Sequence, residues 1–71
     1  SELDEKWMWR AIHIARDAKK IGEVPIGAIV VEANGGILAA ASNRTITDID
    51  PTAHAEILAL RTAAFVLAIT V

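Results

Sequence analysis

The chain has 71 residues with a formal net charge of −2, and 54% of its residues are apolar. This length limits it to a single domain, residues 1–71, which buries only about 60% of the surface of its unfolded chain, so marginal stability and help from a partner are expected. Because there is no cysteine, the composition excludes disulfides and thiolate-bound metal. The net charge gives no overall attraction for nucleic acid. The sequence contains no run of about 20 apolar residues that could span a membrane.

Residues 3–20 are predicted to form an amphipathic helix. Apolar residues recur there at the three- and four-residue spacing of one helical face. They are Leu3, Trp7, Ala11, Ile14, Ala18 and Ile21. Acidic residues open the segment, basic residues close it, and Gly22 suits its end. The first ten residues lack the basic-then-apolar order of a secretory signal, so we expect a cytoplasmic protein.

A β-hairpin is predicted next. The run VPIGAIVVE is β-branched and opens with a proline, which is tolerated at the first residue of a strand. NGG, at residues 34–36, indicates a two-residue turn in which both central positions need a positive φ, and ILAAAS forms the returning antiparallel strand. The small residues 39–41 let a helix approach closely. Gly27 is expected to serve a bulge or close packing rather than to bind a ligand.

A polar loop and a second helix follow. NRTITDID indicates a loop, after which Asp50 suits the N-cap and Pro51 the first helical position. The buried stripe of this helix is predicted to be Ile57, Leu60, Ala64 and Leu67. Residues 65–71 fit a third, core strand as well as they fit helix. The order is therefore helix, strand, strand, helix, with a third strand left open, in an α/β domain.

The start of this second helix holds a histidine and a glutamate, His54 and Glu56, two residues apart. Neutral imidazole binds zinc well, and a carboxylate that is not itself a ligand can carry a proton to and from metal-bound water. In mid-helix the two side chains would diverge by about 200°. In the first turn, a metal lying off the helix end can be reached by His54 while Glu56 reaches over it. The alternative is a pair of capping or solvated polar residues.

The residues around this pair carry a family resemblance. TAHAEILALR, preceded by DP and further back by EVPIGAIVV and SNR, closely resembles the N-terminal half of the zinc-dependent cytidine and deoxycytidylate deaminase superfamily, specifically the bacterial tRNA adenosine deaminases. The resemblance covers about residues 3–64. It implies a cytidine-deaminase-like αβα sandwich, reduced here to helix, strand, strand and helix. It also implies hydrolytic deamination of adenosine to inosine in tRNA or a nucleoside.

The resemblance implies a role for each matching residue. His54 looks like the zinc-binding histidine, and Glu56 looks like the general acid/base that moves protons between zinc-bound water, the base and the leaving ammonia. Asn43 matches the asparagine that hydrogen-bonds the nucleoside, and Ile26 matches an apolar residue that packs on the flipped base. The backbone N–H of Ala55 is similarly placed to contact the base. The alternatives are a turn residue, a core residue and simple packing, respectively.

The sequence departs from the family in its zinc ligands. The family supplies two more ligands as cysteines in a PCxxC segment after the third strand, whereas this sequence ends at Val71 without a cysteine. One histidine cannot hold a zinc that keeps a position open for water, and His13 is expected to be a solvated surface residue. Glu23 lies near the pocket in the family, but no role is assigned to it. We therefore expect half of a deaminase, inactive as this chain alone.

Two other classes of function stay open. The first is a non-catalytic α/β module on a deaminase scaffold that self-associates. The charge-free residues 62–71 favour a homo-oligomer or a complementing chain under either interpretation, because an exposed apolar end invites aggregation. The second is RNA binding without catalysis through Arg44 and Arg61, for which surface solvation is the simpler explanation.

Overall fold

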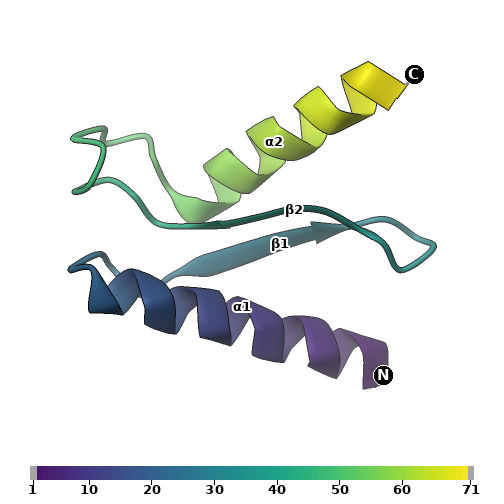
Figure 1. Cartoon of the computed structure of the whole chain (residues 1–71), viewed down its shortest axis with the longest axis horizontal. Coiled ribbons are helices and arrows are strands. Elements are labelled where there is room, and N and C mark those ends of the chain that lie inside the picture. Colours follow the sequence, from purple (N-terminus) through teal and green to yellow (C-terminus); the bar gives the residue numbers. More distant parts are fainter. Residues whose placement is uncertain (1, 71) are drawn as a thin grey trace.

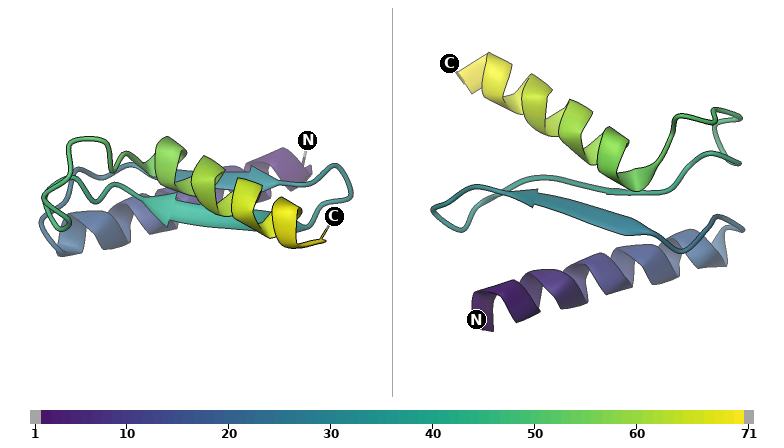
Figure 2. Two further views of the ribbon diagram at one scale, coloured as in Figure 1. Left: turned by 90° about the horizontal axis from the view of Figure 1, so that it is seen from above. Right: turned by 180° about the vertical axis from the view of Figure 1, so that it is seen from behind.

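The computed structural model describes residues 2–70, and the side chains of all of these except residues 3 and 68–70. The elements are α1 (Glu2–Lys20), β1 (Gly27–Val31), β2 (Ile37–Ser42) and α2 (Ala55–Thr70). The two strands form one antiparallel sheet, with α1 on one side of it and α2 on the other (Figures 1 and 2). This layering confirms the predicted deaminase-like αβα arrangement. No helix in the described part of the chain is long and apolar enough to cross a membrane.

Helix α1 ends in a Schellman motif. Gly22 has a φ of 83°, its N–H donates to the carbonyl of Lys19 (3.1 Å), and the N–H of Glu23 reaches back to that of Ala18 (3.0 Å). The helix buries Ala18 and half-buries much of its predicted stripe. The prediction that Ile21 joins this stripe is wrong, because it follows the last helical residue and is 59% exposed.

The hairpin forms as predicted, but its turn has another geometry. Only Gly35 has a positive φ (93°), so the prediction of two such central positions is wrong. The loop is wider, with hydrogen bonds from Gly35 N–H to Glu32 O (2.9 Å) and from Glu32 N–H to Gly36 O (2.8 Å). The side chain of Asn34 accepts a hydrogen bond from the N–H of Gly36 and so stabilises the turn, although Asn34 itself has no positive φ.

The first strand is shorter than predicted and lies very close to α1. It begins at Gly27, so Pro25 stands outside it. A Cβ at Gly27 would lie 2.4 Å from the carbonyl oxygen of Ala11 and 3.1 Å from the nitrogen of Ala15. The prediction that Gly27 serves close packing is therefore confirmed, because any side chain here would push the helix away from the strand.

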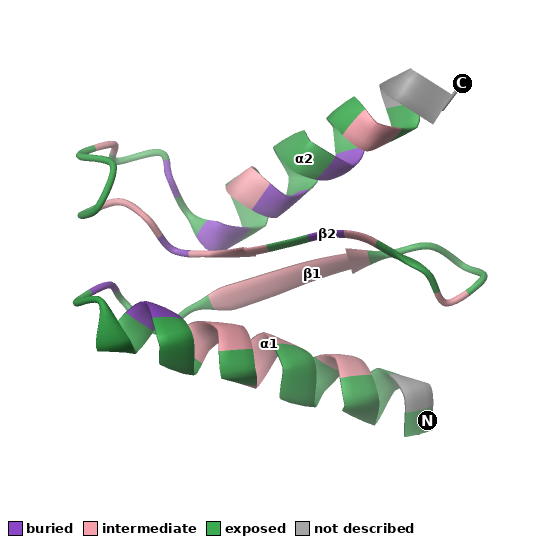
Figure 3. Cartoon of the chain, in the orientation of Figure 1, coloured by how far each residue is buried: buried purple, intermediate pink, exposed green. Residues whose placement is uncertain are grey.

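Helix α2 begins later and buries another face than predicted. It starts at Ala55 rather than at Pro51, and residues 65–70 continue the helix, so they form no third strand; Val71 lies outside the described residues. Among residues 55–67, the part of the helix whose side chains are described, the buried residues are alanines at every fourth position, shown in purple in Figure 3. They are Ala55, Ala59 and Ala63.

The predicted stripe of α2 is wrong because the helix is apolar on every side. The residues of the predicted stripe are exposed rather than buried: Ile57 is 41% exposed, Leu60 57% and Leu67 44%, and Ala64 is exposed as well. The core cluster is built from Ala39, Ala59 and Ala63. Ala39 lies on β2, so the predicted close approach of a helix to the alanine-rich strand is confirmed at this position.

Candidate functional site

Three segments distant in the sequence meet at the first turn of α2. Asn43, directly after β2, is 2% exposed. Its N–H donates to the carbonyl of Ile26 (3.1 Å), and its Oδ1 accepts the N–H of Ala55, also at 3.1 Å. Ile26 itself is 41% exposed. The structure thus brings together Asn43, Ile26 and Ala55, three residues of the predicted site.

His54 and Glu56 flank this junction. The carbonyl of His54 accepts the N–H of Leu58 (3.0 Å), the first hydrogen bond of the helix, and both side chains are exposed. The pair therefore lies at the beginning of α2, where a ligand off the helix end meets the positive end of the helix dipole. The backbone N–H of Ala55, which we expected to contact a base, is donated to Asn43 in this structure.

The predicted helix cap, Asp50, belongs to a local turn instead. Its Oδ1 accepts both the N–H (2.8 Å) and the hydroxyl (2.7 Å) of Thr52, and these bonds hold the pKa of Asp50 below its usual value. The prediction of a cap at Asp50 is wrong because this side chain is engaged two residues ahead. The capping acceptor comes from Asn43, twelve residues before Ala55.

The residues of this chain do not complete a zinc site. A zinc ion with a position open for water needs three protein ligands. The described residues contain no group of three histidine, cysteine, aspartate or glutamate side chains that could hold a metal, and the sequence has no cysteine. His13, the other histidine, is exposed on α1.

Glu23 is the charged residue of this region that the sequence did not assign. It is 4% exposed, and its Oε2 accepts the N–H and the hydroxyl of Thr47, each at 2.5 Å, while Oε1 lies 3.4 Å from the nitrogen of Ile46. Burial raises the pKa of this carboxyl. The hydrogen bonds from Thr47 and Ile46, together with the charge of Arg44, lower the pKa by more than burial raises it, so the net pKa is below its usual value. A glutamate directly after the glycine that ends a helix was the available signal.

The connecting loop, residues 43–54 between β2 and α2, carries a cation, Arg44, whose charge acts on Glu23. The guanidinium of Arg44 binds the carboxylate of Asp48 through Nε and Nη2 at 2.9–3.1 Å. Its charge is therefore largely matched within the loop, and the hydrogen bonds to Asp48 raise the pKa of Arg44. Arg61 is exposed on α2.

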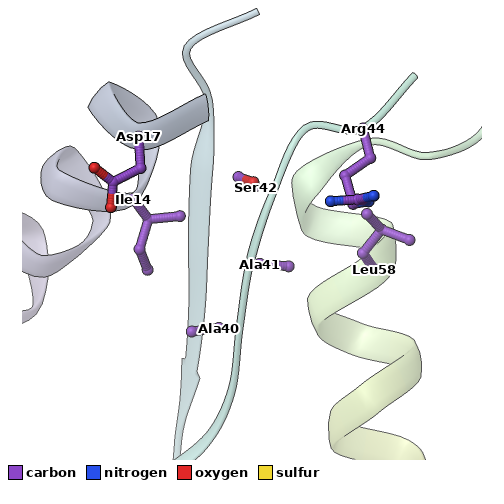
Figure 4. A pocket seen from close by; sticks show the side chains of 7 residues that line it. All are labelled: Ile14, Asp17, Ala40, Ala41, Ser42, Arg44 and Leu58. Atoms are coloured by element: carbon purple, nitrogen blue, oxygen red, sulfur yellow. The ribbon is translucent and has the colours of Figure 1, made fainter. Parts of the chain in front are cut away.

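A groove of about 520 Å³ lies beside this site, along β2 and between the two helices (Figure 4). Ile14 and Leu58 form opposite walls, and Ala40 and Ala41 lie between them, with Asp17 and Arg44 among the lining residues. Neither His54 nor Glu56 lines it, so the groove is separate from the exposed pair at the helix end.

Comparison with known proteins identifies deaminases that are similar to this chain in sequence and structure. Residues 1–70 match the family model of the cytidine and deoxycytidylate deaminase zinc-binding region. The chain is 47% identical over 64 residues to the tRNA-specific adenosine deaminase of Haemophilus influenzae. Among solved structures, a chain from a study of A-to-I editing by tRNA deaminases at the wobble position has a TM-score of 0.82 at 39% identity. Guanine deaminase from Bacillus subtilis has a TM-score of 0.79 at 38% identity.

The matches cover most of this chain but less than half of each relative. They span 90% of this chain and 37% of the Haemophilus protein. For the editing deaminase they span 92% of this chain and 49% of that chain, and for guanine deaminase 90% of this chain and 41% of that chain. Residues 1–70, which the family model matches, contain both helices and the hairpin, with His54 and Glu56 at the start of α2. The chain belongs to the cytidine and deoxycytidylate deaminase family.

Proposed function

We propose that this chain forms the N-terminal part of a zinc-dependent nucleobase deaminase that converts adenosine to inosine in tRNA, and that it is inactive alone. The observation that carries the proposal is the exposed pair His54 and Glu56 on either side of Ala55, at a helix start that buried Asn43 holds in place. The tRNA-specific relative supports the substrate. A tRNA substrate also favours a cytoplasmic location.

Each residue of the site takes a role within this proposal. His54 contributes an imidazole ligand to a zinc ion whose remaining ligands come from another segment, and Glu56 carries protons at the reacting base. Asn43 first fixes the helix start; the two donors of its Nδ2 are the atoms offered to a nucleoside oxygen. Ile26, whose carbonyl holds Asn43, offers an apolar surface to the base.

Complementation tests the proposal. The chain is mixed with the C-terminal remainder of the Haemophilus relative, and inosine in a tRNA anticodon stem–loop and zinc in the purified complex are measured. We expect activity only in the mixture. Glu56→Ala should abolish inosine formation and keep zinc, whereas His54→Ala should lose both. Glu32→Ala and His13→Ala, which change the same residue types at exposed positions, should retain both.

Two results would overturn this assignment. Inosine formed by the Glu56→Ala complex would remove the proton-carrying role. About one zinc per chain in the 71-residue protein alone, with His54→Ala still binding it, would show that other ligands form a different metal site. The same mixture supplied with guanine or cytidine tests the substrate, because one of the similar structures is a guanine deaminase. Turnover of either in preference to the stem–loop would replace the adenosine assignment.

A second candidate is a non-catalytic module that self-associates. The observation that favours it is the outer side of α2, where Leu60 is 57% and Phe65 66% exposed. Native mass spectrometry of the chain, alone and as Leu60→Gln, measures this directly. A homo-oligomer that dissociates in the variant, together with no activity in the complemented mixture, would favour the module over the enzyme.

A further inference from the structure

Glu23 connects two parts of the molecule that are far apart in the sequence. Its backbone is fixed by the Schellman motif, because its N–H donates to the carbonyl of Ala18 at 3.0 Å. Its buried carboxylate reaches the connecting loop, where the N–H and the hydroxyl of Thr47 both donate to Oε2 at 2.5 Å. A single side chain thus attaches the end of α1 to the middle of the connecting loop, 24 residues later.

The part of the loop that Glu23 binds, Ile46 and Thr47, is connected in turn to the start of α2. The N–H of Arg44 donates to the carbonyl of Ala53 at 2.9 Å, directly before His54. The N–H of Asp50 donates to the carbonyl of Thr45 at 3.0 Å, which closes the loop around the residues that Glu23 binds. These hydrogen bonds, joined by the short stretches of loop backbone between them, connect Glu23 to Ala53, directly before His54.

The chemistry of this contact suits a rigid attachment. An ionised carboxylate only accepts hydrogen bonds, and bonds to a charged acceptor are about twice as strong as neutral ones. Burial of such a group is costly unless donors surround it. Because the donors come from two consecutive residues of the loop, Ile46 and Thr47, a shift of the loop would leave the buried charge without partners. The carboxylate therefore favours one loop position over all others.

We propose that Glu23 is a positioning residue, which holds the connecting loop through Thr47 and thereby sets the place of His54 and the first turn of α2. This proposal rests on the proposed function in one respect, which is that the first turn of α2 is treated as part of a catalytic site. The Glu23 carboxylate accepts its hydrogen bonds from Ile46 and Thr47 of the loop, so its effect on His54 is transmitted by the loop backbone.

Amide hydrogen exchange measured by NMR on the 71-residue chain tests the positioning directly. In Glu23→Ala we expect exchange to quicken about tenfold or more at Ile46 and Thr47, the size expected when bonds to a charged group are lost. The same variant should also quicken exchange at Arg44 and Ala55, the two amides that connect the loop to the helix start. The paired strand amides at Val30 and Ala39 report global opening and should not change relative to Glu32→Ala.

Two further variants keep the test decisive. Glu23→Gln retains the length and one acceptor oxygen, so it should restore much of the protection at Thr47 and Ala55. Thr47→Ala removes only the hydroxyl donor and should give a smaller change in the same four amides, even if Glu23→Ala does not fold. Faster exchange at Ile46 and Thr47 alone would overturn the proposal, because the loop would then not transmit to the helix. Uniformly faster exchange, strands included, would also overturn it by showing a purely structural role.

Activity provides a separate measurement in the complemented mixture. Glu23→Ala is expected to lower kcat about tenfold or more, while Glu32→Ala leaves kcat unchanged, because small displacements of reacting groups cost large factors in rate. If the wild-type mixture has no activity, the proposed function fails and the exchange data still decide the positioning role. If the mixture is active and kcat is unaffected by Glu23→Ala, the positioning role fails and the proposed function stands.

Discussion

Replacing Asn43 with alanine tests how the start of α2 is held. The change removes the hydrogen bond that the N–H of Ala55 donates to Oδ1 of Asn43, and it leaves this donor, in a residue that is 0% exposed, buried without its partner. Such a donor costs about 1–3 kcal/mol, and loss of a helix cap costs about 0.5–2 kcal/mol. Because both figures describe the same bond they are not summed, and we expect a loss of about 2 kcal/mol.

Thermal unfolding followed by circular dichroism measures this loss. In a domain of this size 1 kcal/mol shifts Tm by about 4–8 °C, so Asn43→Ala should lower Tm by about 8–16 °C. Asn34→Ala is the matched control: that side chain also accepts one backbone N–H, from Gly36 at 2.9 Å, but in an exposed turn, and about 0.5 kcal/mol is expected. Equal shifts in the two variants would refute the argument that burial of the Ala55 N–H makes the bond important.

Three further predictions concern packing and pH. Gly27→Ala should destabilise the fold by about 1–3 kcal/mol in urea unfolding, because its Cβ would meet the carbonyl oxygen of Ala11 at 2.4 Å; an unchanged midpoint would show that α1 moves away freely. Ala59→Leu should cost about 1–3 kcal/mol, whereas Ala64→Leu, on the exposed side of the same helix, should be near neutral; the opposite order would restore the stripe predicted from the sequence. The pKa of Glu23 is lowered from its ordinary value of 4.5, so the stability it contributes is complete above that pH and is lost as the pH falls through the folded-state pKa; urea midpoints that fall equally in wild type and Glu23→Gln below pH 4.5 would contradict this.

Local patterns predicted the elements well because the elements are defined by local periodicity. The helix over residues 3–20, the strand ILAAAS and the placement of His54 and Glu56 at a helix start all follow from residues within a few positions of one another. For the start of α2, residues distant in the sequence contributed to the outcome. Asp50 and Pro51 form a good local cap signal, but the acceptor that caps α2 comes from Asn43.

The buried face of α2 could not be predicted for a related reason. Apolar residues surround the helix, so periodicity does not single out one side, and size favoured Leu60 over Ala59 for the core. The alanines of β2 reverse this preference, because only a small-residue face lets the helix pack on Ala39. Glu23 directly follows the glycine that ends α1, but this local signal could not identify its partner Thr47, which it meets only after the chain folds.

The alanine face of α2 determines the order in which this helix opens. Each alanine buries a single methyl group, so the contact contributes little apolar free energy per turn. The first turn has in addition the hydrogen bond from Ala55 to Asn43, whereas the turn at Phe65 has its ring 66% exposed. The half of α2 that contains Phe65 should therefore unfold as a separate, lower-energy unit while the half that contains Ala55 stays folded. Helix α2 is therefore expected to stay ordered longest at its start, where His54 and Glu56 lie.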